Sequence, residues 1–209
     1  MITLFFSVFA SLFTVVNPFG TMPIFVGLTQ NDTKERRASI AFRASLFMMI
    51  ILIVSFLGGK YMIQFFGISI ESLRIAGGLI IASSGFALLT GTFSKHKGMS
   101  RRVKDDAFKK EDTSLTPLAI PMLAGPGSIS LLIGLNETTA EIMDWVVVMA
   151  TVVAVSLVTY LILRSSHFMI SLMGASGLNA ISRIIGFIVI ALGIEYILSS
   201  IQVFVKLCG

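Results

Sequence analysis

Long, mostly apolar segments constrain this chain more than any other feature of its sequence. Five of them reach the roughly 20 residues that a helix needs to cross the hydrocarbon core of a bilayer. They cover about 4–29, 45–66, 73–93, 145–163 and 184–205. A sixth segment, about 115–135, has no charged residue from Thr113 to Asn136. The sequence therefore predicts an all-α, polytopic membrane protein with six transmembrane helices.

The basic residues lie between these segments and predict how the chain is oriented. Under the positive-inside rule, connections rich in Lys and Arg face the cytoplasm. The first connection carries Lys34, Arg36, Arg37 and Arg43, the third carries seven cations between Lys95 and Lys110, and the fifth carries Arg164. We therefore expect a multi-pass protein of the cytoplasmic (inner) membrane with both termini outside. Cations with this role do not indicate nucleic acid as a partner.

The two halves of the chain resemble each other. The matches, each shifted by 107 to 109 residues, join Gly67 with Gly174, Arg74–Gly77 with Arg183–Gly186, and Pro18 with Pro126. Because each copy would contain three spans, an odd number, the second copy must enter the membrane in the opposite sense. Inverted repeats are typical of secondary transporters, although duplication also produces symmetric channels and scaffolds. The predicted units are a first repeat at 1–93, a cytoplasmic linker at 94–114 and a second repeat at 115–209.

Both repeats interrupt their first helix at matching positions, near Asn17 and near Gly125. Inside a helix, Pro costs about 3 kcal/mol and Gly about 1 kcal/mol, so paired interruptions suggest a function. A broken helix presents free N–H groups that suit a carboxylate and carbonyl groups that suit an ammonium. The candidate substrate-binding residues are Asn17, Pro18, Gly20, Thr21, Ala124, Gly125, Pro126, Gly127 and Ser128. This uncharged set favours a small zwitterion, and kinks that serve only helix packing are the alternative.

Glu195 is the only acidic residue well inside a predicted span. A carboxyl group at that depth is either a proton-coupling group or a neutral, hydrogen-bonded side chain, and the sequence leaves both readings open. Arg74 and Arg183 open the third and sixth spans, where we expect them to reach the interfaces or to pair with an acid such as Glu71.

Small residues recur along the third and sixth spans, at Gly77, Gly78 and Gly85 in one and at Gly186 and Gly193 in the other. Such faces favour close packing of helices. The predicted spans contain no His, Asp, Lys or Cys side chains that could form a catalytic or metal centre, so we expect neither an enzyme nor a metal or cofactor site. His96 and His167 receive no role.

Several motifs together resemble those of the MarC family of bacterial and archaeal membrane proteins. They read FTVVNPFGTMPIFVGLT at 13–29, FFGIS at 65–69, LRIAGGL at 73–79, PLAIPMLAGPGSIS at 117–130 and SRIIG at 182–186. The resemblance implies six helices in reversed three-helix repeats. For the family's small-neutral-amino-acid transporter members, it implies transport of glycine, alanine and similar substrates. Its motifs fall on Asn17, Pro18, Gly20 and Ala124 to Gly127.

The function predicted from these features is secondary transport of small neutral amino acids such as glycine, alanine and serine. Alternating access would carry it out, with proton coupling left open. An exporter of other small metabolites, a channel and a structural membrane protein are the alternatives. The expected partners are a small neutral amino acid and membrane lipid, with a homo-oligomer left open.

Overall fold

The computed structural model describes residues 1–92, 114–139 and 141–208, and all regular structure in these ranges is helical. The elements are α1 (Ile2–Val16), α2 (Pro18–Leu28), α3 (Lys34–Phe66), α4 (Ile70–Leu89), the π-helix η1 (Ser114–Leu123), α7 (Pro126–Thr138) and α8 (Ile142–Cys208). The predicted all-α class is confirmed for the described residues. The predicted linker, 94–114, lies outside them except for Ser114.

Five helical stretches in the described part of the chain are long and apolar enough to cross a membrane. They are Ile2–Leu28, Lys34–Gly59, Ile70–Leu89, Ile142–Leu172 and Asn179–Val203. These stretches correspond to five of the predicted spans. The sixth, about 115–135, is divided between the 10 residues of η1 and the 13 residues of α7. Each piece alone is shorter than the roughly 20 residues of a spanning helix, so this crossing stays a prediction.

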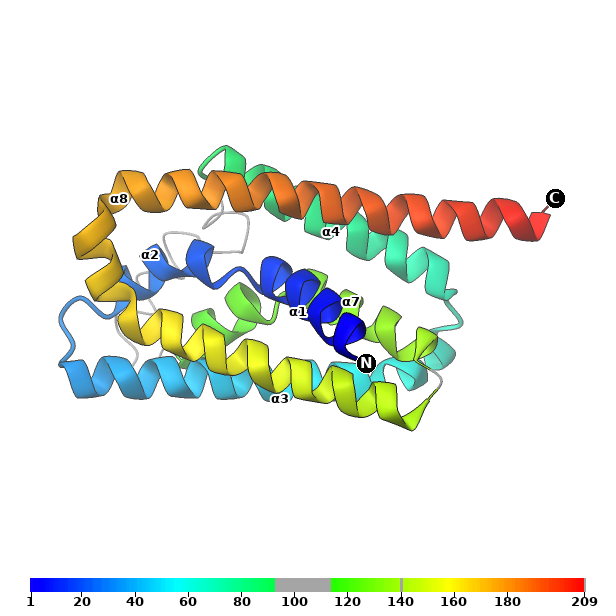
Figure 1. Ribbon diagram of the computed structural model, residues 1–209, viewed down its shortest axis with the longest axis horizontal. Coiled ribbons are helices and arrows are strands. Elements are labelled where there is room, and N and C mark those ends of the chain that lie inside the picture. Colours follow the sequence, from blue (N-terminus) through cyan, green and yellow to red (C-terminus); the bar gives the residue numbers. More distant parts are fainter. Residues whose placement is uncertain (93–113, 140, 209) are drawn as a thin grey trace.

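Helix α8 is a hairpin against which the other long helices pack. Its backbone leaves the helical conformation at Gly174, where φ is 67° and ψ is 172°. Figure 1 shows the two limbs of α8 running in opposite directions, with α1 and α2 between them in this view. The first limb contacts α3, as in the ring contact between Phe56 and Trp145, and the second contacts α4.

The chain turns back at a glycine in two places, between α3 and α4 and between the two limbs of α8. Gly67, between α3 and α4, has φ 63° and ψ 27°, so it differs from Gly174 in ψ but shares its positive φ. A Cβ disfavours positive φ, which explains glycine at both points. The sequence matches that aligned the two halves paired these same glycines.

Two close glycine contacts hold α4 against the second limb of α8. A Cβ on Gly78 would lie 2.6 Å from the carbonyl oxygen of Gly193, and a Cβ on Gly85 would lie 2.6 Å from that of Gly186. Both distances are shorter than real Cβ contacts, so larger residues would force the two backbones apart. The prediction of close packing through small residues is confirmed, and we call these four glycines the glycine seam.

The cations predicted in the first and fifth connections lie within helices instead, so the helix boundaries expected near 45 and 163 were wrong. Helix α3 begins at Lys34, after Thr33, whose hydroxyl accepts a hydrogen bond from the N–H of Arg36 at 3.3 Å. Arg43 therefore lies in the third turn of α3, and Arg164 lies inside α8. Lys and Arg favour helices and extend toward the head groups, so a helix can continue past its apolar segment.

Candidate functional site

The first helix is interrupted at a single residue, Asn17. Its backbone is left-handed, with φ 50° and ψ 67°, and among the described residues it is the one non-glycine with a positive φ. Asparagine tolerates this conformation better than most residues. Its N–H donates to the carbonyl of Phe13 at 2.9 Å, and its Oδ1 accepts from the N–H of Gly20 at 3.0 Å. Asn17 thus ends α1 and caps α2, and Pro18 occupies the first position of α2, where no N–H is needed.

The side chain of Asn17 keeps one polar group unsatisfied. It is 2% exposed, and its Nδ2 has no hydrogen-bond partner within the described residues. The hydroxyl of Thr21 is used locally, donating to the carbonyl of Asn17 at 3.3 Å. A buried N–H donor without a partner costs about 1–3 kcal/mol. The first break therefore holds a donor suited to an oxygen acceptor.

The second interruption lies between η1 and α7. η1 is a π-helix, in which each hydrogen bond joins residues five apart. At its end, the N–H of Ala124 donates to the carbonyl of Ala119 at 2.8 Å. Helix α7 begins with Gly125 as its cap and Pro126 at its first position, so a side-chain cap is absent. The hydroxyl of Ser128 donates to the carbonyl of Gly125 at 2.9 Å. π-Helical segments are rare and often lie at functional sites, and this one of 10 residues was not predicted.

The two breaks lie against each other and against α4. A Cβ on Gly127 would lie 3.4 Å from Cγ1 of Val15, in the last turn of α1, and 2.9 Å from Cγ1 of Ile81 in α4. A Cβ on Gly20 would lie 3.0 Å from Cδ2 of Leu88, also in α4. The sequence-predicted positions thus come together around one face of α4, and small residues at both breaks allow this approach.

Most of the candidate residues are enclosed. The buried ones are Asn17, Pro18, Gly20, Thr21, Ala124, Gly125, Gly127 and Ser128. Pro126 is exposed. Thr21 and Ser128 were expected to bind substrate, but in this conformation their hydroxyls bind carbonyl groups of the breaks.

Glu195 is not part of this enclosed region. Its side chain is exposed on the second limb of α8, whereas Gly193 packs into the glycine seam. Arg74 does not bind Glu71; its Nη2 donates to the carbonyl of Gly134 in α7 at 3.1 Å. Arg183 is exposed.

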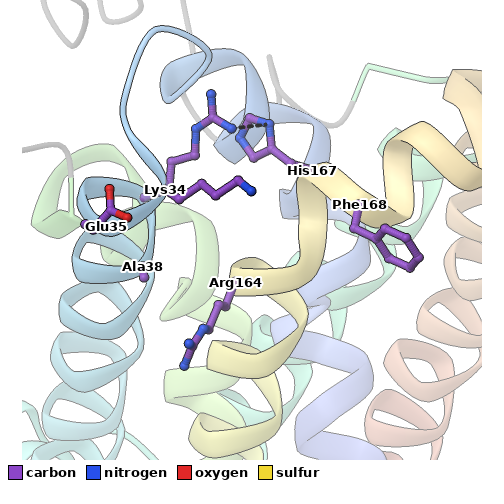
Figure 2. Close-up of a pocket in the computed structure, with 7 residues that line it drawn as sticks. Lys34, Glu35, Ala38, Arg164, His167 and Phe168 are labelled. Atoms are coloured by element: carbon purple, nitrogen blue, oxygen red, sulfur yellow. Dashed lines mark hydrogen bonds between the residues drawn. The ribbon is translucent and has the colours of Figure 1, made fainter.

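A second polar cluster, which the sequence did not predict, joins the end of α2 to α3 and α8. Arg37 donates to the carbonyls of Thr29 at 3.0 Å and Gln30 at 2.8 Å, and its Nη1 lies 3.1 Å from Nδ1 of His167. The Nε2 of His167 lies 3.2 Å from the hydroxyl of Thr29, which itself donates to Phe25 at 2.8 Å. Figure 2 shows the contact between the Arg37 and His167 side chains. His167, left without a role above, therefore ties three helices together.

Taken together, these features define a multi-pass helical membrane protein with two adjoining broken helices. The profile of the family described as MarC family integral membrane protein matches residues 2–205. The chain belongs to this family, which confirms the resemblance noted from its motifs.

Relatives of similar length support the assignment. The chain is 34% identical over 204 residues to the inner membrane protein MarC of Salmonella typhimurium, covering 93% of this chain and 92% of the relative. It is 33% identical over 204 residues to inner membrane protein MarC of Citrobacter koseri, with the same coverage. It is 31% identical over 200 residues to a membrane protein of Buchnera aphidicola, covering 96% and 93%. No solved structure matches the chain. The protein is thus an inner membrane protein.

Proposed function

We propose that this protein is a secondary transporter of small neutral amino acids such as glycine, alanine and serine, which works by alternating access. One observation carries the proposal: the buried Nδ2 of Asn17, which has no partner in the described part of the chain, lies at a helix break that adjoins a second break. A donor kept buried and unpaired costs stability, and a ligand oxygen would remove that cost.

The contacts of the glycine seam support the inverted repeat on which alternating access depends. A shift of 108 residues, one less than the shift of 109 that pairs Arg74 with Arg183, turns Gly78 into Gly186 and Gly85 into Gly193. The same operation converts the contact of Gly78 with Gly193 into that of Gly85 with Gly186. Such an exchange is expected for two copies related by a twofold axis in the membrane plane, as in inverted-repeat transporters. Gly67 and Gly174, which the repeat pairs, also share a positive φ, although their ψ values differ.

The chemistry of the breaks favours a small, neutral amino acid. The N-terminus of α7 has a free dipole end that attracts a carboxylate, and Nδ2 of Asn17 adds a donor. Carbonyl groups at the end of η1 and α1 provide acceptors for an ammonium. None of the nine candidate residues carries a charge, so a zwitterion without net charge fits best. Packing of Ile81 and Leu88 against the break glycines limits the size of the ligand.

Because the candidate residues are enclosed, transport requires the breaks to open toward each side in turn. Helix α4 contacts both breaks, through Ile81 at Gly127 and Leu88 at Gly20, and is joined through the glycine seam to α8. We propose that α4 and the second limb of α8 move as one unit against the broken helices. In this arrangement both termini and the second and fourth connections face outward.

Uptake of labelled glycine, alanine and serine into proteoliposomes tests the proposal. Asn17→Asp retains an oxygen that can accept from Gly20 but replaces the Nδ2 donor with a second oxygen that repels a carboxylate. We expect uptake to fall at least tenfold. Asn136→Asp is the matched control, because Asn136 in α7 is also buried with an unpartnered Nδ2 but lies 11 residues beyond Gly125.

Equal uptake by the parent and Asn17→Asp would contradict the assignment of the site. Saturable flux of other small metabolites but not of amino acids would favour the exporter alternative. Conduction that does not saturate would favour a channel. An imposed pH gradient, applied to the parent and to Glu195→Gln, tests proton coupling. The exposed position of Glu195 leads us to expect equal responses from the two proteins.

A further inference from the structure

A pocket of about 520 Å³ lies between the first turns of α3 and the first limb of α8, apart from the helix breaks. Its lining includes Lys34 and Arg37 from α3, and Arg164, His167 and Phe168 from α8. Three of its side chains are cations, against one acid, Glu35. The pocket therefore has a net positive charge.

The cations of the pocket differ in how strongly they are already engaged. Hydrogen bonds to the carbonyls of Thr29 and Gln30 and to His167 hold the Arg37 guanidinium in place at the pocket. Lys34 and Arg164 are exposed. Figure 2 shows Lys34 extending from α3 toward α8, whereas the Glu35 carboxylate points away from it. The pocket thus combines two exposed cations with one that is held in place.

The start of α3 strengthens this positive field. Thr33 caps the helix, and Lys34 is its first residue, so the positive end of the helix dipole lies at the pocket. Phosphate groups bind readily where a helix N-terminus and basic side chains meet. A ligand with a phosphate group suits both features.

Apolar surface continues from the pocket along α3 and α8. Phe168 is 68% exposed and Phe42 is 54% exposed. Phe42 also packs edge-on against Tyr160, whose hydroxyl accepts a hydrogen bond from Arg164 at 2.9 Å. Phe168 lines the pocket, and Phe42 and Tyr160 lie one helical turn from the lining residues Ala38 and Arg164. All three aromatic residues belong to helices that are apolar enough to cross a membrane. A ligand bound here would have its charged end in the pocket and apolar groups along the helices.

We propose that this pocket binds the phosphate head group of an anionic phospholipid, with its acyl chains lying along α3 and α8. Basic pockets between transmembrane helices on the cytoplasmic side bind such head groups. The apolar surface next to the cations favours a lipid, whose acyl chains can cover it. Free phosphate has no apolar group to bind there. The proposal does not depend on amino-acid transport, and its test measures lipid binding alone.

Native mass spectrometry of the purified full chain in detergent, titrated with dioctanoyl phosphatidylglycerol, tests the proposal. Each Lys or Arg near an anionic surface contributes enough that losing one weakens binding about fivefold. We expect about fivefold weaker binding for Lys34→Gln and for Arg164→Gln, and about 25-fold for both together. Lys34→Arg with Arg164→Lys keeps the charges and should bind within about twofold of the parent, which separates loss of charge from loss of fold.

Arg43→Gln is the matched control, because Arg43 is an exposed cation of α3 that does not line the pocket. Its binding should stay within about twofold of the parent. Unchanged binding in the double Gln variant, or an equal loss in Arg43→Gln, would overturn the pocket as the site. Inorganic phosphate should not displace the lipid at equal concentration; equal displacement would identify a site for free phosphate and overturn the lipid proposal. Dioctanoyl phosphatidylcholine should bind at least tenfold more weakly.

Discussion

Adding one methyl group to the glycine seam should destabilise the protein, while adding one at Gly58, where a new Cβ would meet no atom within 4 Å, should not. In Gly193→Ala, the new Cβ would lie 2.6 Å from both the N of Ala82 and the carbonyl oxygen of Gly78. An ordinary contact needs at least 3.4 Å, so α4 and α8 must separate by about 0.8 Å at this point. Both neighbours are backbone atoms and cannot rotate away. Overpacking of this kind costs about 1–3 kcal/mol.

Gly58→Ala is the matched control, since Gly58 lies in helix α3 and a Cβ there would meet nothing within 4 Å. Alanine is favoured over glycine in a helix by about 0.5–1 kcal/mol, so this variant should be slightly more stable than the parent. Reversible unfolding in mixed micelles by increasing denaturing detergent measures both free energies. Equal stability of the two variants would refute the geometry of the seam.

Combining seam variants tests the contact further. Gly78 and Gly193 meet each other, so Gly78→Ala and Gly193→Ala should together cost less than the sum of their separate effects. Gly85 lies two helical turns from Gly78. The free-energy costs of Gly85→Ala and Gly193→Ala should therefore be almost additive. A fully additive result for the first pair would contradict the direct contact.

Three further predictions use the same unfolding assay. Asn17→Ala should cost about 1–3 kcal/mol, because alanine disfavours the positive φ and loses the cap to Gly20, whereas Asn17→Gly should cost less. Thr29→Val and His167→Ala should show a coupling of about 1 kcal/mol in a double-mutant cycle, and a coupling near zero would mean that their hydrogen bond adds nothing. Arg74→Met should cost about 1–2 kcal/mol by losing its bond to Gly134, and no change would contradict that bond.

The sequence predicted the positions of both helix breaks closely, because Pro and Gly act on the backbone of their own residues. An Asn-Pro pair and a Gly-Pro-Gly triplet inside apolar segments allow few alternatives to an interruption. The π-helix before the second break was not predictable in the same way. Pro117 and Pro121 remove N–H groups, but they do not specify which wider pairing the remaining groups adopt.

The depth of Glu195 was easier to predict than the face on which it lies. Counting residues along a helix gives the distance along its axis, whereas exposure depends on the direction around that axis. Gly186, Val189, Ile190 and Gly193 are buried and fall on one face with helical spacing. Glu195, two residues after Gly193, points to roughly the opposite side. The spacing of the small residues contained this information.

The cluster of Thr29, Arg37 and His167 could not be predicted from sequence. His167 lies 130 residues from Arg37, and a lone histidine in a polar stretch has many uses. The predicted start of α3 was wrong for another reason. Hydropathy marks where a helix enters the hydrocarbon layer, whereas the cap at Thr33 marks where the helix itself begins.

The accessibility of a cysteine at the second break tests most directly whether the paired breaks bind substrate. Cys208 is the single native cysteine, so Ser128→Cys in a Cys208→Ser background gives one thiol at the site. Ser45→Cys in the same background is the control, since Ser45 is also buried but lies in α3, outside the breaks. In proteoliposomes that transport alanine, we expect a small, charged thiol reagent to modify the residue 128 thiol from both sides, alanine to slow that reaction, and the control thiol to remain unmodified. A residue 128 thiol that reacts at the same rate with and without alanine, or that does not react from either side, would contradict a substrate site at the breaks.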